Sequence, residues 1–431
     1  MKEPNIVQAG PLPLGLFETS YQRGIVDPMW PETPIYGSDF VGIDDEKYPG
    51  LRGKMDPQEF LTVARVNTSA KTLPEVATML QSITTFCDYQ MTRGPATADL
   101  RPLQYVPRSY RVTVTVGLGA TFFMDPVSGR DRFGFLHAKP RSLRIPPRLF
   151  GDRFDPSEEQ TDLVFSIASD HKYVNAAIAR SIETIDASLQ VVAVDEGFAR
   201  PDKRAFGRFE DGISNLGNLT RPERESFIFI DEFSEEPAWC RGGSYLVFRK
   251  VEQDLEKWDL LEDDQQSLMI GRQKEDGMPL AKRRDKDFPR EPLFADPVNK
   301  ADGPLKSHSR AVNPRRPPKY SLGLDDMDRR FLRRGYPYLD NIGSLDEETG
   351  KYAPSSFGLL FVAYMNSISR QFEYVTDTWQ MNPDFPCPEA GRDAMFTSGV
   401  FSVLTGGYYF CPPAWRFPKD FLASGLLAEV S

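Results

Sequence analysis

The segment QEFLTVARVNTSAKTLPEVATMLQSITTF (58–86) has the first two clear secondary-structure patterns in the chain. Positions 58–66 are rich in apolar and β-branched residues, which is typical of a strand. In 72–86 the apolar residues recur every three or four positions, and together they form one helical face: Leu73, Val76, Met79, Leu80 and Ile83. Thr72 stands just before that face, where a hydroxyl group can cap the first turn. We therefore expect a strand followed by an amphipathic helix.

The alternation of strands and helices continues to residue 198. YRVTVTVGLG (110–119) alternates with period two, as a half-buried strand does. TDLVFSIAS (161–169) has strand character, YVNAAIARSIETI (173–185) has a helical pattern, and LQVVAVDEGF (189–198) is again typical of a strand. The series strand, helix, strand, strand, helix, strand predicts a ferredoxin-like domain.

A second, weaker copy of this series follows. SYLVFRKV (244–251), FGLLFVAYM (357–365) and GGYYFC (406–411) have strand character, and DLEKWDLL (254–261) has that of a helix. Between them lies 273–320, a segment rich in proline and charge; connections of this length are usually disordered or functional.

The expected fold class is therefore α+β, with two ferredoxin-like domains whose antiparallel sheets are flanked by helices. We expect an irregular, proline-rich arm that wraps the surface (1–55), a first domain (56–205) and a second domain (206–431).

Composition and charge exclude several classes of protein. The chain has 431 residues and a formal net charge of -10, which disfavours binding to the phosphates of nucleic acid. Its apolar runs are shorter than the roughly 18 residues that cross a bilayer, so we expect no membrane partner. Residues 1–17 resemble neither a signal peptide nor a transit segment, and the four cysteines show no CxxC spacing. We expect a cytoplasmic protein with free thiols.

One of only three histidines, His308, lies within KSHSRAVNPRR (306–316). Arg310, Arg315 and Arg316 carry guanidinium groups that bind carboxylates or phosphates, and Asn313 before a proline favours a turn that fixes the backbone. Taken alone, the segment is typical of a surface patch that binds anions.

Two further segments supply a carboxylate and a guanidinium group. FGRFEDGISN (206–215) places Asp211 in a tight turn, and RRFLRRGYPY (329–338) places Arg333 at the end of a short apolar strand. A histidine, a carboxylate and an arginine are the minimal set for a haem peroxidase. The first binds iron, the second moves a proton between the peroxide oxygens, and the third stabilises charge as the O–O bond breaks. His137 and His171 lack such neighbours, and we expect packing or polar roles for them.

The chain resembles the dye-decolorizing peroxidases. The likeness runs in order through YQRGI (21–25), TDLVFSIASD, the DGISN turn, GSYLVFRKVEQDLEKW, HSRAVNPR, FLRRGYPY and YYFCPPA, so it covers most of the sequence. The phrase MNPDFP (381–386) and the chain length resemble the longer members. That family has two ferredoxin-like domains with haem b in the second. The resemblance therefore implies haem b as the cofactor, and hydrogen peroxide and organic reductants as partners.

The resemblance also implies roles for single residues. His308 matches the axial iron ligand of the motif H-x-R-x-x-N-P-R, and Asp211 matches the distal aspartate. Arg333 matches the distal arginine, with Arg334 as the runner-up. In one respect the chain departs from the pattern: the family's GxxDG turn has a glycine three residues before the aspartate, and this chain has Arg208 there.

Further roles are expected for five other residues. Leu359 and Phe361, on one face of a strand, resemble the apolar distal wall that limits access to small peroxides. Arg310 is a candidate contact for a haem propionate, and Glu373 is a weak candidate for the carboxylate that orients His308. Because bulky reductants would not reach the haem, Tyr338 is a candidate surface electron relay, five residues beyond Arg333 and on the opposite face of an extended segment. If Pro337 bends this segment, Tyr336 is the exit instead.

Two functions fit these features. The first is a haem peroxidase that oxidises bulky organic molecules such as dyes and phenols by one-electron steps, most actively at acidic pH because its acid–base group is an aspartate. The second is a protein that binds haem or handles its iron without peroxidase turnover; both need His308, but only the first needs Asp211 and Arg333. A ferredoxin-like binding module without haem would leave this combination of residues to chance. The oligomeric state stays open, a homo-oligomer included.

Overall fold

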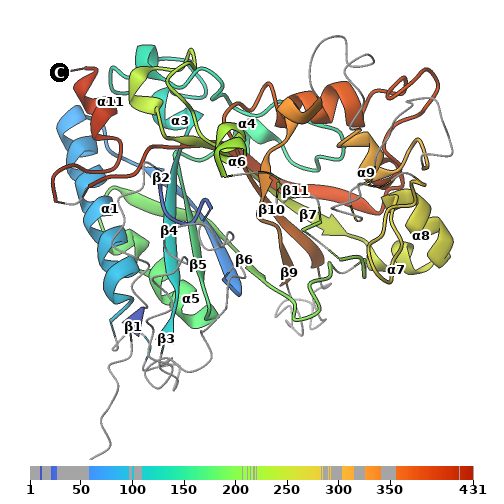
Figure 1. Ribbon diagram of the computed structural model, residues 1–431. Coiled ribbons are helices and arrows are strands. Elements are labelled where there is room, and N and C mark those ends of the chain that lie inside the picture. The colour runs from blue at the N-terminus through green and yellow to red at the C-terminus, as the bar shows by residue number, and fades with distance from the viewer. Residues whose placement is uncertain are drawn as a thin grey trace, which may run out of the picture.

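The computed structural model of the chain describes residues 10–11, 21–26, 58–96, 100, 109–205, 207–210, 212–213, 215–216, 219, 221–282, 284, 290, 292, 303–314, 326–340, 356–416 and 418–430 (Figure 1). Three residues singled out in the sequence, Asp211, Arg315 and Arg316, lie outside this set.

The first half of the chain forms a four-stranded antiparallel sheet with helices on one face (Figure 1). Its elements are β2 (Phe60–Thr68), α1 (Leu73–Arg93), β4 (Val112–Gly119), β5 (Leu163–Ser169), α5 (Lys172–Arg180) and β6 (Leu189–Phe198). The strand order β6-β2-β5-β4 is that of a ferredoxin-like domain. Thr72 caps α1 as expected: its hydroxyl accepts from the backbone N–H of Glu75, whose carboxylate accepts in return from the N–H of Thr72.

The second half repeats this plan. Its strands are β7 (Ser244–Gln253), β8 (Leu332–Arg333), β9 (Tyr336–Asp340), β10 (Ser356–Met365) and β11 (Phe401–Cys411). β7 lies between β11 and β10, while β8 and β9 both pair with the outer edge of β10. If β8 and β9 count as one interrupted strand, the order matches that of the first half, and the predicted α+β class with two ferredoxin-like units is confirmed.

Shorter elements complete the fold. They are β1 (Gly10–Pro11), β3 (Ser109–Tyr110), α3 (Ala120–Phe123), α4 (Pro156–Glu159), α6 (Arg221–Ile228), α7 (Leu255–Asp259), α8 (Asp263–Ile270), α9 (His308–Ala311), a π-helix (Tyr374–Gln380), α10 (Ala394–Thr397) and α11 (Ser424–Ala428). In Figure 1, α7, α8 and α9 lie on the side of the second half away from α1.

The two halves join edge to edge through only two paired positions of β4 and β11, Gly119 with Tyr409 and Leu118 with Phe410. Where the two strands separate, the side chain of Gln22 bridges their backbones with hydrogen bonds. It accepts from the N–H of Val116 at 2.8 Å and donates to the carbonyls of Val116 and Pro412 at 2.9 and 3.0 Å. Residues 21–26 of the arm are therefore mostly buried at this seam rather than wrapped over the surface as expected.

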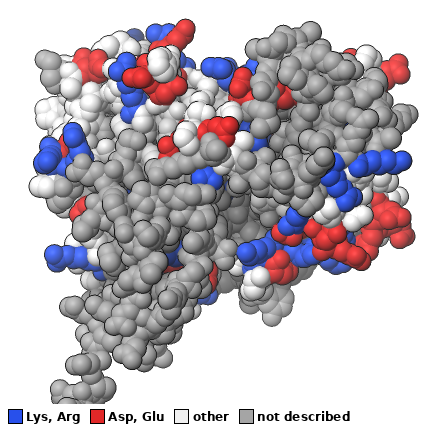
Figure 2. Space-filling view, viewed as in Figure 1, with Lys and Arg blue, Asp and Glu red and all other residues white. Residues whose placement is uncertain are grey.

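The surface is mixed in charge. In Figure 2 acidic side chains gather over α7 and α8, where the sequence runs DLEKWDLLEDD (254–264), and basic ones are interspersed on the same face. All four cysteines are free and buried. Among the described residues, the helices are too short or too polar to cross a bilayer.

Candidate functional site

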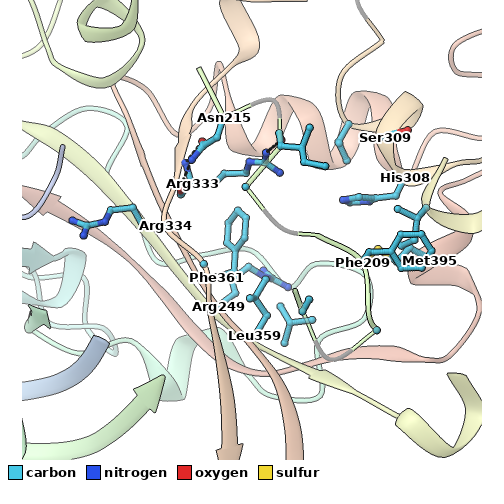
Figure 3. Close-up of a pocket in the computed structure, with 18 of the residues that line it drawn as sticks. Phe209, Asn215, Arg249, His308, Ser309, Arg333, Arg334, Leu359, Phe361 and Met395 are labelled. Carbon is cyan, nitrogen blue, oxygen red and sulfur yellow. Dashed lines mark hydrogen bonds between the residues drawn. The ribbon is translucent and has the colours of Figure 1, made fainter. Parts of the chain in front are cut away.

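A cavity of about 1030 Å³ lies mainly in the second half of the chain. One wall is formed by alternate residues of β7 and β10, and the opposite side includes α9, the π-helix and α10. His308 points into the cavity from α9, while Arg333 and Phe361 approach from the other side (Figure 3). The structure thus brings together residues that are far apart in the sequence.

His308 is held by a carboxylate that the sequence did not reveal. Its Nδ1 lies 2.7 Å from Oδ2 of Asp393, whose side chain is completely buried. An ionised carboxylate only accepts hydrogen bonds, so Nδ1 carries the proton and donates it. The same oxygen accepts from Nε2 of Gln380 at 3.0 Å, and the other carboxylate oxygen accepts from the N–H of Met395 at 2.9 Å. The remaining ring nitrogen, Nε2, is left as a ligand atom.

Glu373, the carboxylate considered from the sequence, has another partner. Its two oxygens bind the guanidinium of Arg144 at 3.1 and 2.8 Å, and this hydrogen bonding raises the pKa of Arg144. Asp393 was missed, although the sequence carries one signal: it stands immediately before AMFT, as a helix N-cap does, and it caps α10.

Arg333 is fixed by the loop that carries the DGISN turn. Asn215 forms two hydrogen bonds with its backbone: the side-chain amide donates to the carbonyl of Arg333 at 2.7 Å, and the side-chain oxygen accepts from its N–H at 2.9 Å. The Arg333 guanidinium donates to the carbonyl of Ile213 at 2.9 Å. The role of Asn215 as a clamp between this loop and β8 was not anticipated.

Arg334, the runner-up, is directed elsewhere. Its guanidinium donates to the carbonyl of Gly24 and to Oε1 of Gln58, the latter at 3.0 Å. In Figure 3 its side chain extends away from the group formed by Arg333 and His308. Of the two arginines, Arg333 is therefore the one that faces His308 across the cavity.

The neighbours of Asp211 are described, although Asp211 itself is not. Gly212 lines the cavity with a φ of +80°, a conformation that favours glycine. On the other side, Glu210 forms two hydrogen bonds with Arg290, at 2.9 and 2.5 Å, which hold the pKa of Glu210 below its usual value. This turn is thus anchored on the Glu210 side of residue 211.

Arg208 adopts a backbone conformation that favours glycine. Its φ is +67°, in the left-handed region that costs non-glycine residues about 1–2 kcal/mol. The turn nevertheless closes, because the N–H of Ala205 donates to the carbonyl of Phe209 and the N–H of Arg208 to that of Ala205, both at 2.9 Å. Arg208 thus donates the second of these hydrogen bonds from a strained backbone conformation.

Leu359 and Phe361 both line the cavity, as the alternation along β10 predicted. Opposite Phe361 in the sheet, Arg249 of β7 also faces the cavity. Its guanidinium pairs with the carboxylate of Asp152, and burial raises the pKa of Asp152. Arg249 was read only as part of a strand, although a cation within SYLVFRKV was a signal that this strand faces a polar space.

Two expected roles are not supported by position. Arg310 is buried and donates to the carbonyl of Gly303 at 2.8 Å, and it is not among the residues that line the cavity. Tyr338 has 0% of its surface exposed, and its hydroxyl lies 3.1 Å from Ser356. Burial raises its pKa to about 12. A surface relay at Tyr338 is wrong because β9 is covered on the face where this ring lies.

The strain at Arg208 gives a test of the turn. We expect Arg208→Gly to be more stable than Arg208→Ala by about 1 kcal/mol, because both variants lose the exposed ion pair with Asp259 but only glycine relieves the left-handed backbone. Urea unfolding of the two variants measures the difference. Equal stability would show that the turn does not need the left-handed conformation at this position.

Comparisons with known proteins place the chain in a family. Residues 55–199 match the family model described as Dyp-type peroxidase, N-terminal, and residues 202–416 match Dyp-type peroxidase, C-terminal. Among curated proteins, the deferrochelatase of Yersinia pestis is 27% identical over 427 residues, which is 94% of this chain and 87% of that protein. The deferrochelatase of Shigella flexneri is 28% identical over 329 residues, covering 73% of this chain and 69% of that protein.

Solved structures show the same fold. A DyP-type peroxidase from Cellulomonas bogoriensis superposes with a TM-score of 0.69 at 22% identity, covering 98% of this chain and 99% of that one. Ferric DtpA from Streptomyces lividans gives a TM-score of 0.69 at 22% identity, covering 99% and 100%. The two family models together span most of the sequence, from residue 55 to residue 416, and the chain therefore belongs to the Dyp-type peroxidase family.

Proposed function

We propose that the protein is a haem peroxidase that reduces hydrogen peroxide and oxidises organic reductants, dyes and phenols among them, in one-electron steps. The observation that carries the proposal is the pair His308–Asp393. A histidine whose Nδ1 is fixed by a buried carboxylate presents Nε2 toward a large cavity, which is how a proximal haem ligand is arranged.

The lining of the cavity suits haem in polarity and charge. Aromatic and aliphatic side chains supply the apolar surface that a porphyrin needs: Phe209, Val251, Trp258, Ile270, Val312, Phe331, Leu359, Phe361, Phe372, Val375, Trp379, Met395, Phe396 and Phe401. Ten arginines and Lys203 also line the described part of the cavity, against only three carboxylates. This excess of positive charge suits a cofactor with two propionates. The sequence contains no CxxCH motif, which attaches haem covalently in c-type cytochromes, and we therefore infer haem b.

Residues on one side of the cavity would bind the iron, and residues on the other side would act on the peroxide. His308 would bind the iron, and Asp393 would keep the imidazole in one orientation and raise its basicity. Bound haem supplies an iron that takes up peroxide and stores its oxidising equivalents. Arg333, held by Asn215 and the Ile213 carbonyl, would stabilise the negative charge that develops on the peroxide oxygens. Asp211, on the same loop, would move the proton between them.

A second candidate function is supported by the relatives. Several curated relatives are named deferrochelatase, and the handling of haem iron without peroxidase turnover would use the same cavity and His308. The two functions differ in what they require of Arg333 and Asp211. Release of iron from bound haem, followed with a chelator that colours on binding ferrous iron, measures the second function directly.

We expect His308→Ala to lose stable haem binding, because no other histidine lines the cavity in the described part of the chain. The Soret absorbance of the purified variant, relative to protein concentration, measures haem occupancy. His137→Ala and His171→Ala are matched controls that should keep full occupancy; His171 caps α5, and His137 is exposed. Full occupancy with an unchanged spectrum in His308→Ala would refute the assignment.

Arg333→Leu and Asp211→Asn should each slow the reaction with peroxide by roughly a hundredfold or more, because each removes a group that acts on the breaking O–O bond. Stopped-flow absorbance after mixing with one equivalent of hydrogen peroxide measures the rate. Arg200→Leu is the matched control, since Arg200 also lines the cavity but pairs with Asp202 at 2.7 Å. If neither substitution slows the reaction while iron release persists, haem-iron handling is the better account.

A further inference from the structure

One loop of the first half reaches the cavity of the second. Residues 148–153, RLFGDR, connect elements of the first half, yet Leu149 and Phe150 line the same cavity as His308. This contribution lies outside the motifs that mark the haem site in the sequence.

The loop is fixed on both sides of its tip. The carboxylate of Asp152 accepts from the N–H of Leu149 at 2.8 Å and pairs with Arg249. The backbone of the loop pairs with the edge of β11. The N–H of Val403 donates to the carbonyl of Gly151 at 2.8 Å, and the N–H of Arg153 donates to the carbonyl of Val403 at 2.9 Å. β11 has a register irregularity next to this point, between Val403 and Thr405. Phe150 is thus presented by a rigid loop.

The exposure of Phe150 is unusual for a residue held so firmly. Half of its surface, 50%, is open to solvent, whereas its neighbour Leu149 is 8% exposed. A large aromatic side chain that both lines a cavity and meets solvent lies at the opening of that cavity. Exposed apolar surface at such an opening is typical of a binding site.

A second aromatic residue stands beside this opening. A Cβ atom added at Gly151 would lie 3.6 Å from the ring of Phe396, so this ring is next to the loop, and it lies 6.3 Å from the ring of His308, centroid to centroid. Phe396 belongs to α10, the helix that Asp393 caps. The path from Phe150 past Phe396 therefore leads to the axial histidine, and its surface is apolar and aromatic.

We propose that Phe150 forms, together with Phe396, a binding subsite for planar aromatic reductants at the opening of the cavity. This inference rests on the proposed peroxidase function and assigns residues to the binding of its organic reductant. Two molecules of a phenol would each give up one electron and one proton, and one hydrogen peroxide would be reduced to two waters. A reductant docked here needs no tyrosine relay through β9.

The test compares Phe150→Ala with wild type in the haem-loaded protein. With guaiacol as the aromatic reductant, we expect KM to rise roughly three- to tenfold, the loss expected for one aromatic contact. The KM values for hydrogen peroxide and for ferrocyanide, a reductant without a ring, should stay unchanged. Phe150→Trp should keep the low KM for guaiacol.

Phe233→Ala is the matched control, because Phe233 is 86% exposed and lies outside the residues that line the cavity. Its KM for guaiacol should equal that of wild type. An unchanged KM in Phe150→Ala, or an equal rise for guaiacol and ferrocyanide, would overturn the subsite.

A binding measurement separates failure of the subsite from failure of the proposed function. Titration of resting, haem-loaded protein with guaiacol, followed by the change in Soret absorbance, gives a dissociation constant without turnover. Phe150→Ala should weaken that binding by a similar factor even if wild type shows no peroxidase activity. Equal binding by wild type and variant would refute the subsite whatever the activity.

Discussion

The hydrogen bond between His308 and Asp393 determines what the cavity can do. A carboxylate without exposed surface is costly unless its oxygens are satisfied, and here three donors meet them: the imidazole, the Gln380 amide and the Met395 backbone. Because Nδ1 is committed to this bond, Nε2 is the only ring nitrogen left for a ligand. The π-helix supplies Gln380 and α10 supplies Met395, so both elements contribute a donor to the Asp393 carboxylate.

The cavity depends on both halves of the chain. The haem site was expected in the second ferredoxin-like domain, and most of the lining does come from there, but the first half also contributes residues, Leu149 and Phe150 among them. Asp152, also of the first half, offsets the charge of Arg249. Since β4 and β11 share only two paired positions, these contacts and those of Gln22 couple the two sheets where backbone pairing ends. Separation of the halves would therefore open the site.

Local patterns in the sequence were sufficient for most of the fold. The strand 189–198 has the predicted bounds, and α1 begins after Thr72 as its capping pattern indicated. Long-range contacts were not predictable in the same way. Asp393 lies 85 residues from His308, and a cap signature does not say which histidine its carboxylate will meet. The relay at Tyr338 was wrong for a related reason: alternation along a strand gives the face of a side chain but not what covers it.

The redox potential of the bound haem tests the role of Asp393 most directly. An anionic carboxylate makes the imidazole a stronger donor and favours ferric iron, whereas an amide keeps a hydrogen bond without the charge. Asp393→Asn should therefore retain haem and raise the midpoint potential of the ferric–ferrous couple in a spectroelectrochemical titration. Glu373→Gln, which removes a buried carboxylate paired with Arg144 instead, should leave that potential close to wild type. An unchanged potential in Asp393→Asn would contradict the account.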